Sequence, residues 1–224
     1  MSNSNIIKFS GVNFSYGQQK VLHDLSFSVE KGEFICLTGK SGCGKSTLLR
    51  LINSLLHRED GEIELLGENI DNWEIHQLRR KMGYVLQEGA LFPHLTVYQN
   101  MCYCMNLNNY DEVRCRQRIE ELLPLVNLDK EILNKFPEKL SGGQGQRVGI
   151  VRAIAHNPEI VLMDEPFSAL DEETRENLQN LVKNIHQHLN TTFIMVTHNK
   201  DEAEKLGTRI IHMNEGKIST VNTN

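Results

Sequence analysis

The first part of the chain alternates apolar and polar residues in the way that strands with one buried face do. Residues 25–29 (LSFSV) follow a strict period of two, and residues 8–14 contain two short apolar stretches separated by a glycine. Residues 30–33 (EKGE) have the composition of a turn. A second patch of short strands is predicted over residues 61–84, and we expect it to extend the first sheet.

Three segments are apolar on both faces, as central strands of a parallel sheet are: residues 34–38, 160–163 and 192–196. The helix predicted over residues 46–56 presents one apolar face made of Leu48, Leu49, Ile52 and Leu55. The helix between the last two strands has an apolar stripe made of Leu178, Leu181, Val182, Ile185 and Leu189. Strand, helix and strand in succession imply parallel strands.

The pattern changes to helices between the first and second of these strands, from about residue 87 to residue 158. Thr96, followed three residues later by Gln99, has the form of a capping box. After Asp111 the apolar positions recur at helical spacing, at Cys115, Ile119, Leu122, Leu123 and Val126. An inserted helical subdomain is therefore predicted.

The length of the chain, 224 residues, suffices for one large domain with a substantial core. We expect a single domain over residues 1–224. Its β-rich and core regions are predicted at about 1–86 and 159–224, with the helical subdomain at about 87–158.

A glycine-rich loop joins the first apolar strand to the helix that follows it. The sequence GKSGCGKS fits the phosphate-loop pattern G-x-x-x-x-G-K-[ST]. Its glycines let successive N–H groups converge on phosphates, Lys45 adds a positive charge there, and the Ser46 hydroxyl suits Mg²⁺. The residues expected to contact the nucleotide are Gly39, Lys40, Ser41, Gly42, Cys43, Gly44, Lys45, Ser46 and Thr47.

Two carboxylates follow the apolar strand at residues 160–163. Asp164 and Glu165 fall at the C-terminal end of a parallel strand, which is the edge where such sheets bind ligands. Asp164 is suited to hold Mg²⁺ through its water shell, and Glu165 to orient and polarise an attacking water. The alternative, a cap for the following helix, needs only one of the two acids.

Three further side chains are candidates for the same site. His198 follows the strand at residues 192–196 and emerges at the same sheet edge, where an imidazole reaches a γ-phosphate or the water. Gln87 ends a strand-like segment and offers an amide to Mg²⁺ or to water. Tyr16 is suited to stack on adenine, although an aromatic residue in a strand also fits a core.

Charge and composition narrow the class of protein. The formal net charge of -5 and the pI near 6.0 argue against a broad nucleic-acid surface. No run approaches the roughly 18 apolar residues that cross a bilayer, and the first residues lack the regions of a secretory signal, so we expect a cytoplasmic protein. The five cysteines form no C-x-x-C pair, which fits buried thiols in a reducing compartment.

A second anion-binding helix start is predicted at residues 140–147, LSGGQGQR. Ser-Gly-Gly at the start of a helix exposes backbone N–H groups of the kind that hold an anion. The phosphate loop already serves one nucleotide, and the second site falls in the helical subdomain. Ser141, Gly142, Gly143 and Gln144 are therefore predicted to contact a nucleotide held by another copy, which makes the active site composite.

With these motifs in this order, the chain resembles the ATP-binding cassette (ABC) family over nearly its whole length. The matching features are Tyr16, GKSGCGKST, Gln87, LSGGQ, VLMDEP, SALD and His198. The resemblance implies an α/β fold: a P-loop NTPase core with a mostly parallel sheet, an N-terminal antiparallel β subdomain and an inserted α-helical subdomain. It also implies ATP and Mg²⁺ as cofactors, and it places Asp171, in SALD, near the seam between two cassettes.

The resemblance further implies partners and a location. Cassettes of this family pair head to tail over two ATP molecules, most simply here as a homodimer, and they join integral membrane permease subunits and, in importers, a substrate-binding protein. Such an ATPase lies peripherally on the inner face of the cell membrane and needs no nucleic acid. Residues 78–96 resemble importer cassettes for quaternary amines and related osmoprotectants. Residues 88–93 are the predicted groove for the membrane partner, with ordinary packing in the helical subdomain as the alternative.

The chain departs from the family pattern at two glycines. Where the family usually reads LSGGQQQR and VAIARAL, this chain has Gly145 and Gly149 inside the helix. Each glycine costs about 1 kcal/mol relative to alanine in a helix interior. A loosened helix and a closer packing of the helix are both consistent with the sequence.

Two other classes of protein share part of the pattern. A guanine-nucleotide switch or a small-molecule kinase shares the phosphate loop but has no use for LSGGQ, and the N-K-x-D guanine signature is absent. A cassette ATPase that acts on ribosomes or DNA is the alternative to a transporter. Such proteins usually carry two cassettes or a long coiled-coil insertion, and this sequence has neither.

Overall fold

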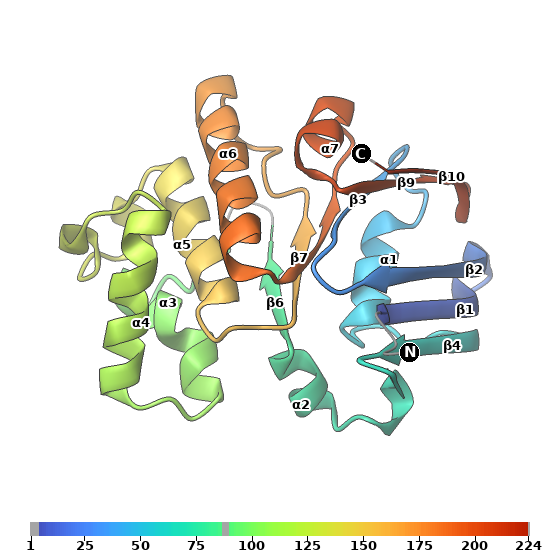
Figure 1. Ribbon diagram of the computed structural model, residues 1–224, viewed down its shortest axis with the longest axis horizontal. Helices are drawn as coiled ribbons and strands as arrows, with labels where there is room; N and C mark the ends of the chain where they lie inside the picture. The colour runs from blue at the N-terminus through green and yellow to red at the C-terminus, as the bar shows by residue number, and fades with distance from the viewer. Residues whose placement is uncertain (1–4, 87–89, 224) are drawn as a thin grey trace. The chain divides into compact units, whose positions relative to one another are not determined.

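The computed structural model of the chain describes residues 5–86 and 90–223. Contacts within the chain divide it into two compact units. Unit 1 comprises Met1–Arg79 and Thr191–Asn224, and unit 2 comprises Arg80–Asn190. The predicted helical subdomain falls within unit 2, which also contains two strands and a long helix of the predicted core (Figure 1).

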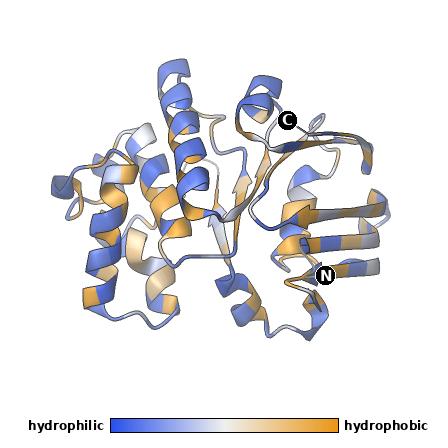
Figure 2. Ribbon diagram, viewed as in Figure 1, coloured by the Kyte–Doolittle hydropathy of each residue, from blue (hydrophilic) through white to orange (hydrophobic). Residues whose placement is uncertain are grey.

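Unit 1 begins with an antiparallel sheet in the strand order β2-β1-β4-β5. Its strands are β1 (Asn5–Tyr16), β2 (Gln19–Glu30), β4 (Asp60–Leu65) and β5 (Glu68–Asn69). Buried and exposed residues alternate along β1 and β2, which Figure 2 shows as alternating hydrophobic and hydrophilic positions. The rings of Phe9 and Phe27, which are paired across the two strands, stack with their centroids 4.7 Å apart. The predicted extension of the first sheet by a second patch of strands is confirmed for β4 and β5.

The second patch of strands is shorter than the sequence predicted. Residues 70–81, expected to be part of it, form a 3₁₀ turn (Ile70–Asn72) and α2 (Ile75–Arg80). The side chain of Asn69 accepts a hydrogen bond from the Asp71 amide and so starts the turn. The last predicted strand, β6 (Met82–Val85), belongs to another sheet.

The rest of unit 1 is the parallel sheet that leads to the glycine loop, with the strand order β10-β9-β3-β8. Its elements are β3 (Phe34–Thr38), α1 (Lys45–Ile52), β8 (Thr192–Val196), α7 (Lys200–Leu206), β9 (Arg209–Asn214) and β10 (Lys217–Thr223). Strand β3 pairs in parallel with both β8 and β9, and β10 pairs antiparallel with β9. All residues of β3 and β8 are buried, as predicted from their continuous apolar character.

Helix α1 is shorter than the sequence predicted. It ends at Ile52, and Leu55, expected on its apolar face, is 55% exposed. Ser54 adopts a positive φ of 52°, and the side chain of Asn53 accepts a hydrogen bond from the Leu55 amide at 3.2 Å. These two polar residues turn the chain out of the helix before the apolar pattern ends.

Unit 2 combines two parallel strands with four longer helices, and its strands β6 and β7 pair in parallel, with Tyr84 opposite Leu162. Its elements are β6, α3 (Val97–Leu107), α4 (Glu112–Leu125), 3₁₀ turns at Lys130–Ile132 and Pro137–Lys139, α5 (Gly142–Ile154), β7 (Ile160–Asp164) and α6 (Glu172–Leu189). Helix α3 packs on both α4 and α5, and α5 packs on β6 (Figure 1).

The helices of unit 2 begin where the sequence predicts. The Thr96 hydroxyl accepts a hydrogen bond from the Gln99 amide, and the Gln99 side chain accepts one from the Thr96 amide, so the predicted capping box is confirmed. Asp111 caps α4 in the same way. The predicted apolar positions of α4 are buried, so the helical spacing correctly located its inner face.

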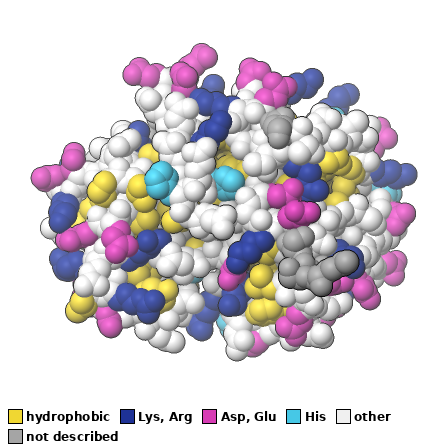
Figure 3. Space-filling model, viewed as in Figure 1, with side chains coloured by type: hydrophobic (Ala, Val, Ile, Leu, Met, Phe, Trp, Pro, Cys, Tyr) yellow, Lys and Arg dark blue, Asp and Glu magenta, His cyan; other side chains and the backbone are white. Residues whose placement is uncertain are grey.

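Acidic residues gather in the first turns of two helices. Glu172 and Glu173 begin α6, and Asp201 and Glu202 begin α7. Figure 3 shows carboxylates at the tip of each of these helices. Negative charge there interacts favourably with the helix dipole. No helix within residues 5–86 and 90–223 combines the length and the apolar character needed to span a bilayer.

Candidate functional site

The predicted phosphate loop of unit 1 has a backbone that only glycine fits. Gly39, Gly42 and Gly44 adopt φ angles of 143°, 78° and 102°. A Cβ added to Gly39 would lie 2.2 Å from the carbonyl oxygen of Met213, and one added to Gly44 would lie 2.6 Å from a methyl group of Leu22. The loop therefore requires glycine both for its torsion angles and for the close approach of its neighbours.

The loop opens directly into α1, whose N-cap is Gly44. The helix start carries no side-chain cap hydrogen bond among the described residues, and its first turn holds no acidic residue. Backbone N–H groups at such a helix start, together with the helix dipole, favour an anion. Lys40, Ser41 and Gly42 are exposed at the tip of the loop.

Lys45 brings a positive charge into the centre of the loop. Its side chain is only 6% exposed, and its ammonium donates hydrogen bonds to the carbonyl oxygens of Gly39 at 2.8 Å and Lys40 at 3.0 Å. The Cys43 sulfur lies 3.8 Å from the same nitrogen, whereas Thr47 is buried under the loop. The loop thus holds a nearly buried ammonium group at the place where a phosphate would bind, and its hydrogen-bond partners within the described residues are carbonyl oxygens and a sulfur rather than a carboxylate.

His198 emerges in unit 1 at the same sheet edge as the phosphate loop. Strands β3 and β8 run parallel, and the Thr197 amide donates to the Leu37 carbonyl at 3.1 Å, so both strands end side by side. His198 is exposed. The predicted placement of this histidine beside the loop is therefore consistent with the sheet register.

Residues that the sequence analysis missed hold the turn around His198. The Thr197 hydroxyl donates to the carboxylate of Glu202, which is 6% exposed, at 2.5 Å. The Asn199 amide donates to the Thr197 oxygen, and the Asn199 side chain caps α7. The pattern T-H-N-x-x-E was the available signal, because a hydroxyl and an Asx cap flanking a histidine indicate a fixed turn.

Tyr16 lies at the end of β1 and is 46% exposed. Its ring meets the edge of the Phe14 ring, with centroids 4.8 Å apart. The alternative of a core position is therefore wrong, and the ring has a free surface on which an aromatic base can stack.

In unit 2, Asp164 and Glu165 lie where the sequence predicts, at the end of β7, and both are half-buried. Glu165 adopts a positive φ of 46°, and its carbonyl oxygen accepts hydrogen bonds from the Ser168 amide and hydroxyl at 3.3 and 3.1 Å. A non-glycine residue in this left-handed region is strained and persists only where its surroundings fix it. The backbone thus turns sharply at the predicted catalytic residue.

A contact from the signature helix supports this turn; this helix is α5, which begins in the LSGGQ sequence at residues 140–144, here called the signature segment. The Gln146 side chain, 1% exposed, donates a hydrogen bond of 2.8 Å to the Pro166 carbonyl oxygen. Gln146 was not predicted from the sequence, because a single polar residue inside a helix shows no pattern that would indicate its partner. Gln87 lies outside the described residues. Its preceding strand β6 ends at the same edge as β7 because the two strands are parallel.

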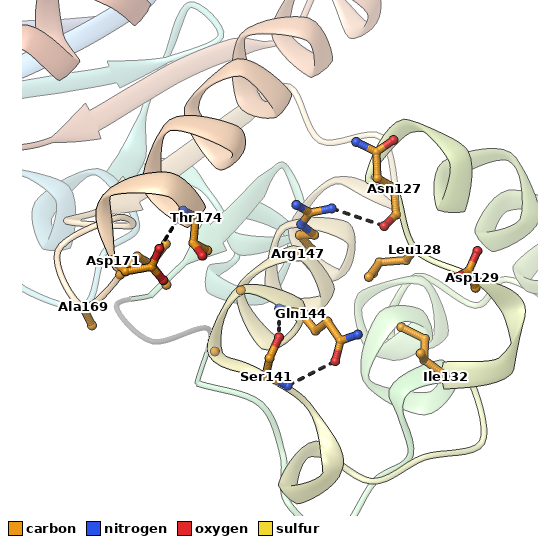
Figure 4. Close-up of a pocket in the computed structure, with 13 residues that line it drawn as sticks. Asn127, Leu128, Asp129, Ile132, Ser141, Gln144, Arg147, Ala169, Asp171 and Thr174 are labelled. Carbon is orange, nitrogen blue, oxygen red and sulfur yellow. Dashed lines mark hydrogen bonds between the residues drawn. The ribbon is translucent and has the colours of Figure 1, made fainter.

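The signature segment begins α5 in unit 2, as predicted. Ser141 is the N-cap: its hydroxyl accepts from the Gln144 amide at 3.2 Å, and the Gln144 side chain accepts from the Ser141 amide at 3.1 Å (Figure 4). Ser141 and Gly142 are exposed. A Cβ on Gly143 would lie 2.7 Å from the Thr174 methyl group, so this glycine lets α5 approach α6.

The start of α5 lines a cavity of about 410 Å³. Asp171 and Thr174 of α6 line it together with Asn127, Ile132 and the signature residues (Figure 4). The carboxylate of Asp171 accepts a hydrogen bond from the Thr174 amide at 3.0 Å, and this bond lowers the pKa of Asp171 below its usual value. Asp171 is thus the cap of α6 and also part of the cavity wall beside the signature.

The donor set available for a metal ion is sparse. Within residues 5–86 and 90–223, no group of three or more His, Cys, Asp or Glu side chains could hold a metal ion. Ser46 at the start of α1 and Asp164 at the end of β7 offer oxygen ligands and are half-buried. Mg²⁺ is usually held by one or two protein oxygens together with phosphates and water, so each of these two side chains, one in unit 1 and one in unit 2, is by itself a donor type that fits Mg²⁺ bound with a nucleotide.

Known sequences match this arrangement of motifs. Residues 22–168 match the family described as ABC transporter. The chain is 46% identical to the ergothioneine transport ATP-binding protein EgtV of Helicobacter pylori (strain G27), with coverage of 93% of this chain and 97% of that protein. It is 44% identical to the glycine betaine/carnitine/choline transport ATP-binding protein OpuCA of Bacillus subtilis (strain 168), with coverage of 97% and 58%. The chain thus spans little more than half of the latter protein.

Solved structures match the fold over almost the whole chain. The structure of cbiO1 from Clostridium perfringens, part of the ABC transporter complex cbiONQ, has a TM-score of 0.90 at 26% identity and covers 99% of this chain and 89% of that one. The dimeric post-hydrolysis state of the ATP-binding cassette MJ0796, bound to ADP and Pi, has a TM-score of 0.83 at 30% identity and covers 97% and 98%. The predicted α/β P-loop fold, with its antiparallel β and inserted helical parts, is therefore confirmed. The chain belongs to the ABC transporter family and is an ATP-binding, ATP-hydrolysing subunit of an ABC transporter.

Proposed function

We propose that two copies of this chain bind two ATP molecules head to tail, with each ATP held between the phosphate loop of one copy and the signature segment of the other. The observation that carries this proposal is the second, exposed helix start at Ser141 and Gly142, which opens on a cavity of about 410 Å³. Like the start of α1, it presents N–H groups and a helix dipole to an anion. One nucleotide on the phosphate loop of the same copy does not need this second site.

The phosphate loop binds the triphosphate in this proposal. Backbone N–H groups of residues 39–47 and the ammonium of Lys45 surround the β- and γ-phosphates, and Tyr16 stacks on the adenine. Lys45 already lies within hydrogen-bond distance of the loop carbonyls, so it has only to exchange these partners for phosphate oxygens. The positive charge is thus arranged before ATP arrives.

The hydrolytic residues come from strand ends. Glu165 accepts a proton from the attacking water and aligns it with the γ-phosphorus, and His198 and Gln87 contact the γ-phosphate or that water. Ser46, Asp164 and Gln87 are the residues that would hold Mg²⁺, which supplies charge neutralisation of the phosphates when bound. Hydrogen bonds fix the turn beside His198 and the backbone of Glu165. They support the roles proposed for these two residues, because each side chain extends from a backbone position that is held in place.

We infer that the whole assembly is an importer. The chain would act as a single ATPase domain, with its helical subdomain at about residues 87–158, on the inner face of the membrane with permease subunits and a substrate-binding protein. EgtV, OpuCA and the Fe(3+) ions import ATP-binding protein FbpC of Haemophilus influenzae (strain 86-028NP) are 46%, 44% and 40% identical to it, although their names give different cargoes. Similar identities with different cargoes favour selection of the cargo by the other subunits.

A complementation experiment tests the shared site. Lys45→Ala disables the phosphate loop, and Ser141→Arg fills the signature cavity, so neither chain alone should hydrolyse ATP. In a mixture, half of the dimers are mixed and each mixed dimer carries one intact site, so about one quarter of the wild-type activity should return. A mixture of two Lys45→Ala preparations is the control. The absence of recovery, with mixed dimers detected by native mass spectrometry, would contradict the head-to-tail arrangement.

A further inference from the structure

Within unit 2, residues 92–96 are held by a fully buried asparagine. Asn100 on α3 is 0% exposed. Its side-chain oxygen accepts a hydrogen bond from the Phe92 amide at 2.8 Å, and its side-chain nitrogen donates to the carbonyl oxygens of Phe92, Leu95 and Thr96 at 3.0 to 3.1 Å. These four bonds use both polar atoms of the side chain and bind it to the backbone of residues 92–96. This segment therefore has one conformation fixed by α3.

A buried arginine on α5 also contacts this part of the chain, at residues 90 and 92. Arg152 is 7% exposed, and one of its nitrogens donates to the Ala90 carbonyl oxygen at 3.0 Å. Its guanidinium carbon lies 5.4 Å from the centroid of the Phe92 ring, which also packs against Tyr103 of α3. Burial lowers the pKa of Arg152, which reflects the energetic penalty for desolvating its charge. The Arg152 guanidinium is buried despite this desolvation penalty, although an apolar side chain would fill the same space. This points to a positioning role.

Helix α5 makes further contacts with other segments of unit 2. Gln146, six residues before Arg152, donates to the Pro166 carbonyl oxygen in the loop after Glu165. The residue directly after Arg152 is Ala153, whose backbone packs against β6 so closely that a Cβ on Gly83 would lie 2.1 Å from the Ala153 oxygen. Ser141 begins this helix. One rigid helix thus bears the signature at its start and contacts the segments next to Glu165 and Gln87.

We propose that Arg152 is a positioning residue that makes the segment at residues 90–96 move together with the signature helix α5. A displacement of this segment then changes the direction in which Ser141 and Gly142 point. Conversely, closure of two copies over ATP displaces the segment. This inference rests on the proposed function, since it assigns to the link a task in ATP hydrolysis. The groove predicted at residues 88–93 for a membrane partner includes the described residues Ala90 to Pro93, so the link begins where that partner would dock.

Two measurements on the full chain test the link. In Arg152→Met, which keeps the length and apolar part of the side chain, amide hydrogen exchange of residues 90–96 should accelerate by about tenfold or more, because the anchor at Ala90 is lost. The kcat for ATP should fall about tenfold, while the KM for ATP stays within about twofold, because the phosphate loop is untouched. Arg152→Lys should recover part of both, since an ammonium group still donates to the Ala90 carbonyl.

The matched control is Arg118→Met on α4. Arg118 also donates to main-chain and side-chain oxygens just beyond the end of α5, at Ala155 and Asn157, and its hydrogen bonds within the described part of the chain do not reach residues 90–96. It should lower the melting temperature without changing the exchange of residues 90–96 or the ratio of kcat to KM. If Arg152→Met does not fold, Asn100→Asp, which keeps the acceptor and loses the donors, is measured in its place with the same expectation for the segment.

The outcomes separate the link from the proposed function. Unchanged exchange of residues 90–96 in both Arg152→Met and Arg152→Lys would overturn the link. So would a loss of kcat in Arg118→Met that equals the loss in Arg152→Met. If the wild-type chain hydrolyses no ATP, the proposed function fails, and the exchange measurement still decides whether Arg152 couples the segment to α5.

Discussion

Gly145, one of two departures from the family pattern, offers a sharp test of how the signature helix is stabilised. It lies in the first turns of α5, and its amide donates to the Ser141 carbonyl oxygen at 2.9 Å, as in a regular helix. A Cβ added there would meet no atom of the described residues within 4 Å. Closer packing, one of the two explanations for this glycine, therefore has no support at this position.

The expected size of the effect follows from this geometry. Gly145 has no positive φ, so alanine can adopt its backbone without strain. Replacing glycine with alanine in a helix stabilises it by about 0.5 to 1 kcal/mol, because the unfolded chain loses conformational freedom. For a chain of this size, about 1 kcal/mol corresponds to a rise in melting temperature of roughly 2–4 °C.

The measurement is thermal unfolding of Gly145→Ala and of the wild type without nucleotide. Gly143→Ala is the control on the same helix, because its Cβ would lie 2.7 Å from the Thr174 methyl group and force a shift. We expect Gly145→Ala to be more stable than the wild type and Gly143→Ala to be less stable than Gly145→Ala. A melting temperature of Gly145→Ala below that of the wild type would show that the glycine is needed, and it would refute the open space inferred around it.

Three further substitutions address the nucleotide site. Lys45→Ala should weaken ATP binding by about tenfold or more, because a charge-assisted contact to the phosphates is lost. Isothermal titration calorimetry with ATP measures this affinity, and a normal affinity would contradict the phosphate-loop assignment. Glu165→Gln should keep ATP binding, lose nearly all hydrolysis and accumulate an ATP-bound dimer in size-exclusion chromatography, whereas unchanged turnover would remove Glu165 as the base. Thr197→Val should lower the free energy of unfolding by about 1 to 3 kcal/mol, because the buried carboxylate of Glu202 loses the hydrogen bond from the Thr197 hydroxyl. Urea unfolding measures this, with Thr197→Ser, which keeps the hydroxyl, as the control. Equal stability of Thr197→Val and the wild type would show that the bond is unimportant.

The features that the sequence predicted correctly are those set by local chemistry. The strand at residues 34–38, the capping box at Thr96, the helix start at Ser141 and the inner face of α4 all follow from side-chain type and spacing, and each is present in the structure. The phosphate loop was predictable for the same reason, because three positive φ angles and a lysine follow from a fixed pattern of residues. The nucleotide-binding part of the site is therefore largely encoded in local sequence.

The features that the sequence did not predict depend on contacts between distant residues or on weak local competition. Helix α1 ends three residues before Leu55 because Asn53 and Ser54 favour a turn over continuation of the helix. The spacing of apolar residues alone does not reveal this competition between turn and helix. Residues 70–81 contain too few apolar residues to distinguish short strands from short helices. Gln146 and Arg152 have partners that lie 20 and 62 positions away, so no local pattern identifies them.

Three buried polar side chains of unit 2 share one physical property that bears on how the molecule moves. Asn100, Gln146 and Arg152 are at most 7% exposed, and each donates a hydrogen bond to the backbone of a loop. Releasing one of these loops would leave a buried donor unpaired, which costs about 1 to 3 kcal/mol for a neutral group and more for a charged one. Movement of the loop together with its helix avoids this penalty. The loops around Glu165 and after Gln87 are therefore expected to move with α3 and α5, so that an event at the nucleotide is transmitted by displacement of helices rather than by rearrangement of the loops themselves.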